Sequence, residues 1–182
     1  MLKAFNALGR FSVIVATPSS SFSRRIVSML SLLIIIFCKI MGGQIVVAVG
    51  AVIKDRRGRI LLVRHVPEYK SFWSGKWICP GGRLKLGESI EDGILREVAE
   101  ETHLHIKLTR PLIPFERIVK ENDETKLHVI YIDYLAEVVG GELKPDDDVG
   151  EALWASKEDI LRLWDELHED TKKLLKIAGV VD

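Results

Sequence analysis

Apolar residues recur along this chain in short runs separated by turn residues. Runs rich in Val and Ile, with few polar interruptions, predict strands of a buried sheet. The expected strands cover residues 45–54, 59–65, 77–79, 105–108, 112–120, 126–138 and 152–155. Turns are expected at 55–58, 81–82, 121–125 and 140–141. The run at 126–138 is apolar on both sides, which predicts a central strand covered on both faces.

Two stretches have the apolar period of an amphipathic helix instead. In residues 90–102, Ser89 is the expected N-cap, and Ile94, Leu95, Val98 and Ala99 fall on one broad side that we expect to be buried. In the second stretch, Ser156 is expected to cap a helix that continues to residue 177.

The first forty residues differ in charge from the rest of the chain. No Asp or Glu precedes Asp55. Residues 26–40 are nearly all apolar and follow the basic pair Arg24 and Arg25. This apolar run is short for a membrane span, which needs about 20 residues, and Lys39 interrupts it.

Three interpretations of this segment stay open. It is a membrane anchor that contacts the bilayer through residues 24–40, a cleaved signal peptide, or an over-extended and dispensable start. In none of them does the segment carry chemistry. We therefore expect an N-terminal extension at 1–43 and one working domain at 44–180, with Met41 as the alternative start.

Composition narrows the function of the working domain. The chain has 182 residues with 26 basic and 26 acidic side chains. This balance gives no support for a nucleic-acid-binding surface, which needs a basic excess. Cys38 and Cys79 are the two cysteines, too few for a disulfide framework or a zinc site. A reducing, cytoplasmic location is the expectation.

The stretch Gly81–Leu104 carries the candidate chemistry. Three carboxylates fall within five residues of the expected helix, at Glu97, Glu100 and Glu101, and Arg96 lies beside them. At about 100° per residue, they share one side of the helix next to the buried side. Like charges this close repel one another unless a cation lies among them. Oxygen ligands favour Mg²⁺, for which Mn²⁺ can substitute, over zinc or copper.

An acidic helix face exposed to solvent is the competing interpretation. It explains neither the two glycines that precede the helix nor the lack of lysines paired with these glutamates. We therefore predict a divalent-metal site for phosphate chemistry, in which the metal polarises phosphorus so that water can attack.

The same stretch resembles the Nudix box, the signature of the Nudix hydrolases, which reads G-x5-E-x7-R-E-U-x-E-E-x-G-U with U a bulky apolar residue. The matching positions are Gly82, Glu88, Arg96, Glu97, Val98, Glu100, Glu101 and Leu104. Six of the seven fixed positions agree, and the late glycine is His103. The resemblance implies an α/β/α sandwich, a mixed β-sheet with the box helix on one face and the C-terminal helix on the other. His103 is expected just past the helix at positive φ, as a structural substitution and not a ligand.

The resemblance also implies roles for individual residues. The implied metal ligands are Gly81 (through its carbonyl), Glu97, Glu100 and Glu101. Either Glu100 or Glu101 orients the attacking water. Arg96 and Glu88 form a pair that orients the glutamates, with Glu88 behind the ligands.

Residues outside the box are expected to complete the site. The resemblance implies a further carboxylate from the acidic segment before the last strand, with Asp148 and Glu151 as candidates; an acidic surface loop is the alternative. Phe72 and Trp73 lie on the loop before the box, where aromatic rings stack on a base or sugar or else cover the edge of the core. Arg64 is a further candidate for substrate binding.

The implied reaction is Mg²⁺-dependent hydrolysis of a phosphoanhydride in a nucleoside diphosphate linked to another moiety. The Trp77-x-x-Pro-Gly-Gly lead-in and the Gly-Gly-Glu-Leu-Lys turn at 140–144 resemble those of small ADP-ribose and nucleoside triphosphate hydrolases. Of these substrates, an ADP-ribose-like molecule is favoured over (oxidised) nucleoside triphosphates. A non-catalytic nucleotide-binding module is the alternative from another class. Whether the chain forms a homodimer is left open.

Overall fold

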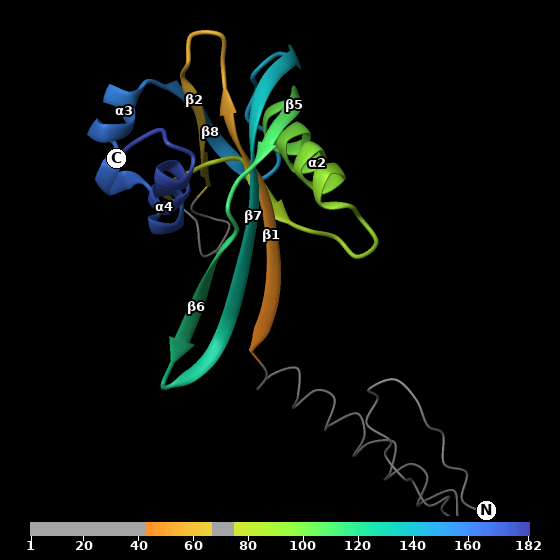
Figure 1. Cartoon of the computed structure of the whole chain (residues 1–182), viewed down its shortest axis with the longest axis vertical. Coiled ribbons are helices and arrows are strands. Elements are labelled where there is room, and N and C mark those ends of the chain that lie inside the picture. Colours follow the sequence, from red (N-terminus) through yellow and green to blue (C-terminus); the bar gives the residue numbers. More distant parts are fainter. Residues whose placement is uncertain (1–42, 67–74) are drawn as a thin grey trace, which may run out of the picture. The chain divides into compact units, whose positions relative to one another are not determined.

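A computed structural model of the chain describes residues 43–66 and 75–182. Over these residues, eight strands form one mixed sheet with helices on both sides (Figure 1). The strands are β1 (Gln44–Lys54), β2 (Ile60–His65), β3 (Trp77–Ile78), β4 (Gly81–Arg83), β5 (Leu104–Pro111), β6 (Phe115–Glu121), β7 (Glu124–Gly141) and β8 (Val149–Ala155). The helices are α2 (Ile90–Thr102), α3 (Lys157–Arg162) and α4 (Glu169–Ile177), with a 3₁₀ turn, η1, at Trp164–Glu166. The predictions for residues 1–42, Phe72 and Trp73 lie outside the described residues.

The sheet is built around β1 and β7, which run parallel along the whole of β1, from Gln44 beside Leu127 to Lys54 beside Glu137. The other pairings between these eight strands are antiparallel. β7 also pairs with β5 and β6, which confirms the predicted central strand. The β6–β7 hairpin turns through Asn122 and Asp123, both at positive φ, and its tip extends away from the helices (Figure 1).

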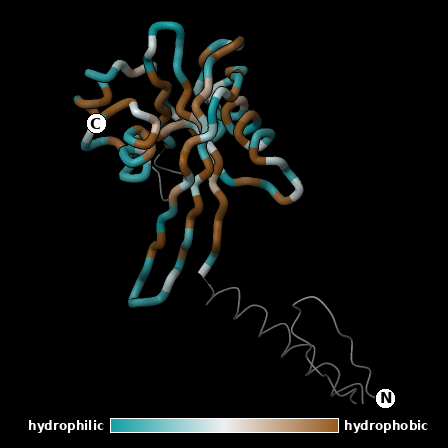
Figure 2. The backbone as a smooth tube through the Cα atoms, in the orientation of Figure 1, coloured by the Kyte–Doolittle hydropathy of each residue, from teal (hydrophilic) through white to brown (hydrophobic). Residues whose placement is uncertain are grey.

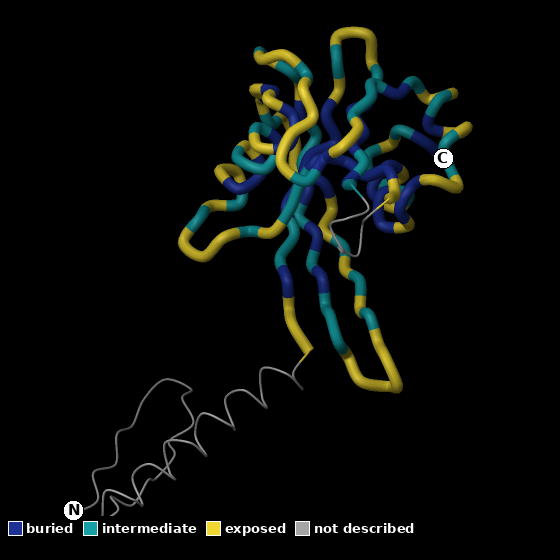
Figure 3. Tube along the Cα trace, turned by 180° about the vertical axis from the view of Figure 1, so that it is seen from behind, coloured by how far each residue is buried: buried dark blue, intermediate teal, exposed yellow. Residues whose placement is uncertain are grey.

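Alternate residues of the central strands contribute side chains to two separate hydrophobic cores, one on each face of the sheet. On one face, Val49 and Ala51 pack with Ile94 and Val98 of α2. On the other face, Val52 packs with residues of α3 and α4. Apolar and buried positions therefore follow the strands and the inner sides of the helices (Figures 2 and 3). The predicted sandwich, with one helical layer on each face, is confirmed.

The structure corrects four local expectations. Leu95 is 39% exposed, so the buried side of α2 is narrower than predicted. Gly81 and Gly82 form β4 instead of an open turn, because β1 offers them a free edge. Gly140 and Gly141 end β7 instead of forming a turn, since they pair with β5.

The fourth correction concerns the C-terminal helix. It is not continuous to residue 177, because the chain leaves α3 at Leu163 and starts α4 at His168. Leu167, between them, is 1% exposed, so the break turns an apolar side chain into the core. Within the described part of the chain, none of the helices has the length and apolar character needed to cross a bilayer.

Candidate active site

Two neighbouring glycines let a helix carboxylate approach the sheet. In the β1–β4 pairing, Gly81 lies opposite Gly50. A Cβ atom on Gly81 would lie 2.4 Å from the carbonyl oxygen of Val49, and one on Gly82 would lie 2.5 Å from Glu97 Oε2. Any side chain at these positions would collide, so the sharp bend and the close approach both require glycine.

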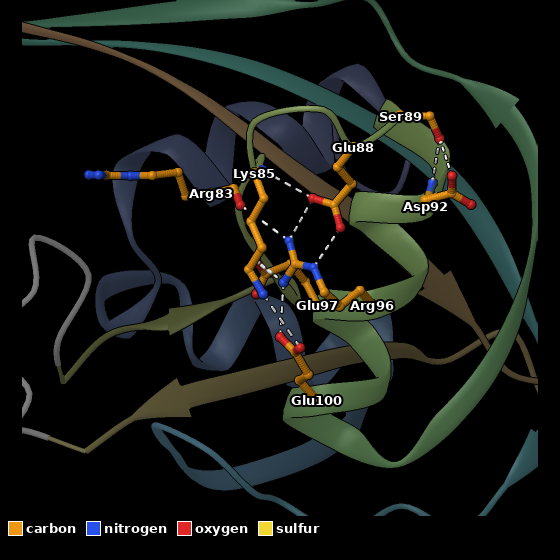
Figure 4. Close-up of polar contacts among 8 residues, drawn as sticks. All are labelled: Arg83, Lys85, Glu88, Ser89, Asp92, Arg96, Glu97 and Glu100. Atoms are coloured by element: carbon orange, nitrogen blue, oxygen red, sulfur yellow. Dashed lines mark hydrogen bonds and ion pairs between the residues drawn. The ribbon is translucent and has the colours of Figure 1, made fainter.

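Helix α2 starts at a well-formed cap. The Ser89 hydroxyl accepts a hydrogen bond from the Asp92 backbone N–H at 3.1 Å and donates to Asp92 Oδ2 at 2.7 Å (Figure 4). This contact satisfies one of the free N–H groups of the first turn. Ile94 and Val98 are fully buried and anchor the helix on the sheet. The glutamates on the adjacent side are therefore held in a fixed position.

One guanidinium, that of Arg96, contacts three carboxylates (Figure 4). Its Nε and Nη2 donate to the two oxygens of Glu88 at 2.6 and 2.9 Å. Its Nη1 donates to Glu97 Oε1 at 2.6 Å and to Glu100 Oε2 at 2.9 Å. The hydrogen bonds from Arg96 lower the pKa of Glu88 to about 2. The Glu100 side chain is 42% exposed and also lies 3.6 Å from Lys85 Nζ, so it faces solvent.

Glu101 is the most buried of the three predicted glutamates, at 2% exposure. Its Oε2 accepts a hydrogen bond from the Gly81 N–H at 3.0 Å, and its Oε1 lies 3.3 Å from His65 Nε2. Burial raises the pKa of Glu101 to about 7, although both of these contacts oppose the rise. Burial also raises the pKa of Glu97 against the opposing effect of Arg96. A bound cation would stabilise both carboxylates in their charged form.

His65 lies between Glu101 and a second acid, Asp148. Its Nδ1 is 3.2 Å from Asp148 Oδ2. Burial alone would lower the pKa of His65, but the carboxylates of Glu101 and Asp148 outweigh burial and raise it. The structure therefore brings Asp148, distant in sequence, to the buried end of the glutamate cluster.

A cavity of about 260 Å³ opens beside this cluster. Around the Glu97 and Glu101 carboxylates, the cavity is lined by His65, Gly81, Gly82, Glu97, Glu101, Asp147 and Asp148. Strands β6 and β7 and helix α4 supply a second set, which includes Phe115, Tyr131, Asp133, Asp170 and Leu174. Glu100 is not part of the lining.

The second set combines aromatic rings with two acids. The rings of Phe115 and Tyr131 stack with centroids 4.6 Å apart. Asp170 accepts hydrogen bonds from Tyr131 Oη at 2.6 Å and from Arg117 Nη1 at 3.0 Å. Asp133 is 6% exposed, and its Oδ2 has no hydrogen-bond partner within the described residues. Burial raises the pKa of Asp133 to about 7.

The predicted site residues Arg64 and Glu151, which lie outside the box, are also apart from the cavity. Arg64 pairs with Glu166 and with Glu151, whose Oε1 is 3.4 Å from Arg64 Nη1. The Arg64 guanidinium also lies over the Trp77 ring, 4.7 Å from its centroid. Neither Arg64 nor Glu151 belongs to the cavity lining. Strand alternation explains this, because Arg64 and His65 point to opposite faces of the sheet.

The three glutamates, predicted on one side of the helix, do not all line the cavity. Along α2, Glu97 and Glu101 lie about 40° apart, whereas Glu100 lies about 60° from Glu97 on the other side. Glu97 and Glu101 therefore face the cavity, and Glu100 faces Arg96 and solvent.

The groups that line the cavity fit a divalent cation. Glu97, Glu101 and Asp148 supply carboxylate oxygens, and Glu101 is too deeply buried to be solvated by bulk water. Gly82 leaves space that the Glu97 carboxylate fills, so a ligand oxygen reaches the edge of the sheet. Hard oxygen donors of this kind suit Mg²⁺ or Mn²⁺.

His103 confirms the predicted backbone conformation. It caps the C-terminus of α2 at φ 57°, in the left-handed region, and its N–H donates to the Ala99 carbonyl. Its Nε2 lies 2.7 Å from Asp146 Oδ2, on the outside of the cavity.

Sequence reasoning missed His65, Asp133 and Tyr131. Asp133 did carry a signal, since it is a charged residue in the middle of an otherwise apolar strand run. His65 ends its strand without any local partner, so only the folded structure shows what it faces.

Comparison with known proteins matches the NUDIX domain family over residues 44–176. An "ADP-ribose pyrophosphatase" of Methanocaldococcus jannaschii is 34% identical over 106 residues, which cover 58% of this chain and 59% of that protein. The "Nucleoside triphosphatase NudI" of Escherichia coli is 23% identical over 68% of this chain and 90% of that protein. The crystal structure of a MutT protein from Methanosarcina mazei superposes with a TM-score of 0.61 at 25% identity, covering 76% of this chain and 97% of that one. The matched region thus spans less than two thirds of the first of these relatives.

Proposed function

The chain belongs to the NUDIX domain family, and from this premise we propose that it hydrolyses a phosphoanhydride bond in a nucleoside diphosphate linked to another moiety. The substrate we propose is ADP-ribose-like, and the cofactor is Mg²⁺, with Mn²⁺ able to substitute. A bound divalent cation supplies charge stabilisation at the phosphoryl oxygens and makes phosphorus more electrophilic.

One observation supports this proposal most directly. Two glutamates of α2, Glu97 and Glu101, face a cavity from a helix that packs on the sheet. Arg96 in addition holds the Glu97 carboxylate. Burying two carboxylates four residues apart is unfavourable for stability alone. A bound cation that also contacts phosphate oxygens would offset this cost, because it would neutralise the two negative charges.

The other residues have supporting roles. Arg96 orients Glu97 and is itself held by Glu88. Glu101 lines the cavity, so it is the glutamate that we propose orients the attacking water. Glu100, the other candidate for this role, lies outside the cavity lining.

The substrate class is argued from the relatives and the cavity. The M. jannaschii relative is named an ADP-ribose pyrophosphatase. Stacked rings of Phe115 and Tyr131, next to the polar group of Asp133, suit a moiety that carries both a flat ring and hydrogen-bonding groups. The nucleoside triphosphatase name of the E. coli relative supports nucleoside triphosphates as the second candidate.

A screen of products tests the reaction and separates the candidates. Purified full-length protein with Mg²⁺ is incubated with ADP-ribose, other nucleoside diphosphate derivatives and nucleoside triphosphates. Hydrolysis of ADP-ribose yields AMP and ribose 5-phosphate, whereas a triphosphate yields a nucleoside monophosphate and pyrophosphate. We expect the first pair of products, identified by chromatography.

Substitutions in α2 test the proposed site and supply a matched control. Glu97→Gln and Glu101→Gln should each lower kcat by about 10²-fold or more, the scale for loss of a group that stabilises transition-state charge. Glu91→Gln, an exposed glutamate in the first turn of the same helix, should keep wild-type turnover. Wild-type kcat in both cavity variants at saturating Mg²⁺ would rule out the proposed site. Nucleotide binding without turnover of any substrate would favour a non-catalytic binding module.

The proposal places the working domain at 44–180, in the cytoplasm. A membrane-anchored form depends on residues 24–40, and a homodimer is the oligomeric state to test. Mapping the natural N-terminus by mass spectrometry would decide between starts at Met1 and Met41.

A further inference from the structure

Three potential metal ligands from distant parts of the chain converge at the buried end of the cavity. His65 ends β2, Glu101 lies in the last turn of α2, and Asp148 directly precedes β8. One ligand atom from each lies within 4.8 Å of the others. In an octahedral site with bonds of about 2.1 Å, ligand atoms are about 3 to 4.2 Å apart. A small contraction of this group would therefore form half of a coordination sphere.

The histidine is the unusual member of this group. Its side chain is 7% exposed, yet neither ring nitrogen makes a well-aligned hydrogen bond within the described residues. The neighbouring carboxylate oxygens lie 3.3 and 3.2 Å away but off the direction that a hydrogen bond needs. Buried polar atoms are nearly always hydrogen-bonded, so an unsatisfied imidazole that faces two carboxylates calls for another partner.

Backbone contacts, not the side chains themselves, hold the three residues in place. The β2–β8 pairing shifts register between Arg64 and His65, and irregularities of this kind often redirect a side chain beside an active site. The Val66 N–H donates to the Asp148 carbonyl at 3.0 Å, and the Asp146 N–H donates to the Glu101 carbonyl at 3.1 Å. The ligands are thus positioned before any ion binds.

We propose that His65, Glu101 and Asp148 form a site for a divalent transition metal of the Mn²⁺ class, which this protein binds in preference to Mg²⁺. The reason is the donor set: the two carboxylates suit Mg²⁺ and Mn²⁺ alike, whereas an imidazole nitrogen binds a transition-metal ion better than it binds Mg²⁺. The inference rests on the proposed function, because Glu101 also belongs to the proposed catalytic cluster. It adds the identity of the preferred metal and a nitrogen ligand to that function.

Metal binding without substrate tests this directly. Full-length protein is stripped of metal with EDTA, dialysed and titrated with MnCl₂ or MgCl₂ in a calorimeter. His65→Gln should weaken Mn²⁺ binding by at least about tenfold, since losing even the outer partners of metal ligands costs about 10–100-fold in affinity. Mg²⁺ binding should change much less. Electron spin-echo spectra of the Mn²⁺-loaded wild type should show coupling to an imidazole ¹⁴N nucleus, and the variant should lack it.

A second ligand variant and a control variant complete the experiment. Asp148→Asn, at a side chain that is 26% exposed, should also weaken Mn²⁺ binding without disturbing the core. His105→Gln, an exposed histidine on β5 outside the cavity, should leave both Mn²⁺ affinity and the nitrogen signal unchanged.

The outcomes separate this inference from the hydrolase function. A Mn²⁺ complex without ¹⁴N coupling overturns the inference, and so does an equal loss of Mg²⁺ and Mn²⁺ affinity in His65→Gln. In either case, turnover with Mg²⁺ would leave the proposed function intact. If His65→Gln does not fold, the wild-type spectrum and Asp148→Asn still decide. Absence of turnover would count against the hydrolase function and leave the binding result unaffected.

Discussion

Replacing Asp133 by asparagine should change how the stability of the metal-free protein depends on pH. The variant should gain stability relative to the wild type as the pH rises. Asp133 lies in the middle of β7, and its side chain is buried, with one carboxylate oxygen unpaired within the described residues. Burial is the cause of its raised pKa, which is about 7. The folded protein therefore keeps this proton at a pH where the unfolded chain has lost it.

The sign and size of the effect follow from linkage. The unfolded carboxyl ionises with a pKa of about 4. As pH rises from about 4 to about 7, the unfolded state gains stability over the folded state by roughly 1.4 kcal/mol per pH unit. Asp133 thus lowers the free energy of unfolding by roughly 2.3 kcal/mol between pH 5 and pH 7, and little more above that. Asparagine carries no charge, and the cost of burying its amide is the same at both pH values.

Urea unfolding of the full-length protein in EDTA measures this difference at pH 5 and pH 8. The free energy of unfolding of Asp133→Asn minus that of the wild type should rise by about 2–3 kcal/mol from the lower to the higher pH. Asp123→Asn, in the exposed turn between β6 and β7, is the matched control for replacing an aspartate by asparagine. Parallel changes in Asp133→Asn and the wild type would refute the argument that Asp133 is buried and protonated.

Three further predictions concern the segment that carries the glutamates. Gly82→Ala should lower kcat by about 10²-fold, because a displacement of about 1 Å near reacting groups costs this much and the new Cβ would lie 2.5 Å from the Glu97 carboxylate. The control is Gly87→Ala, at φ +83° with no atom within 4 Å of the added Cβ. It should lose about 1 kcal/mol of stability and keep its kcat. Equal losses of kcat in Gly82→Ala and Gly87→Ala would contradict the steric explanation. His103→Gly should raise the free energy of unfolding by up to about 1 kcal/mol, since glycine adopts the left-handed conformation without strain. Steady-state kinetics should show an unchanged kcat. A large loss of activity at unchanged stability would make His103 a functional residue. Arg96→Lys should lower kcat by roughly tenfold, because an ammonium cannot contact three carboxylates in a fixed geometry, and a wild-type kcat would show that the glutamates do not need this support.

Helix α2 shows what local sequence signals can predict. Its bounds, its cap at Ser89 and the conformation of His103 agree with the sequence analysis. Each of these features depends on residues within a few positions along the chain. The predicted strands were also present, although their ends and the break between α3 and α4 depended on pairing partners and on burial of Leu167.

The contacts within the cavity could not be predicted from local sequence signals. Nothing near His65 in the sequence indicates that it faces Glu101 and Asp148. Nothing near Asp133 indicates that its Oδ2 lacks a hydrogen-bond partner among the described residues. Arg64 and Glu151, both expected near the substrate, pair with each other instead. These arrangements arise from which face each strand residue occupies once the sheet has assembled.

The sequence by itself determined the family, the helix that carries the glutamates and the chemistry these carboxylates suit, because the motif is contiguous and a helix places its residues by a local rule. Only the tertiary structure decided that Glu97 and Glu101 face the cavity while Glu100 does not, and that His65 and Asp148 lie beside Glu101. The physical reason is that burial and long-range strand pairing, which set the surroundings of each carboxyl, are properties of the assembled sheet and not of any one segment.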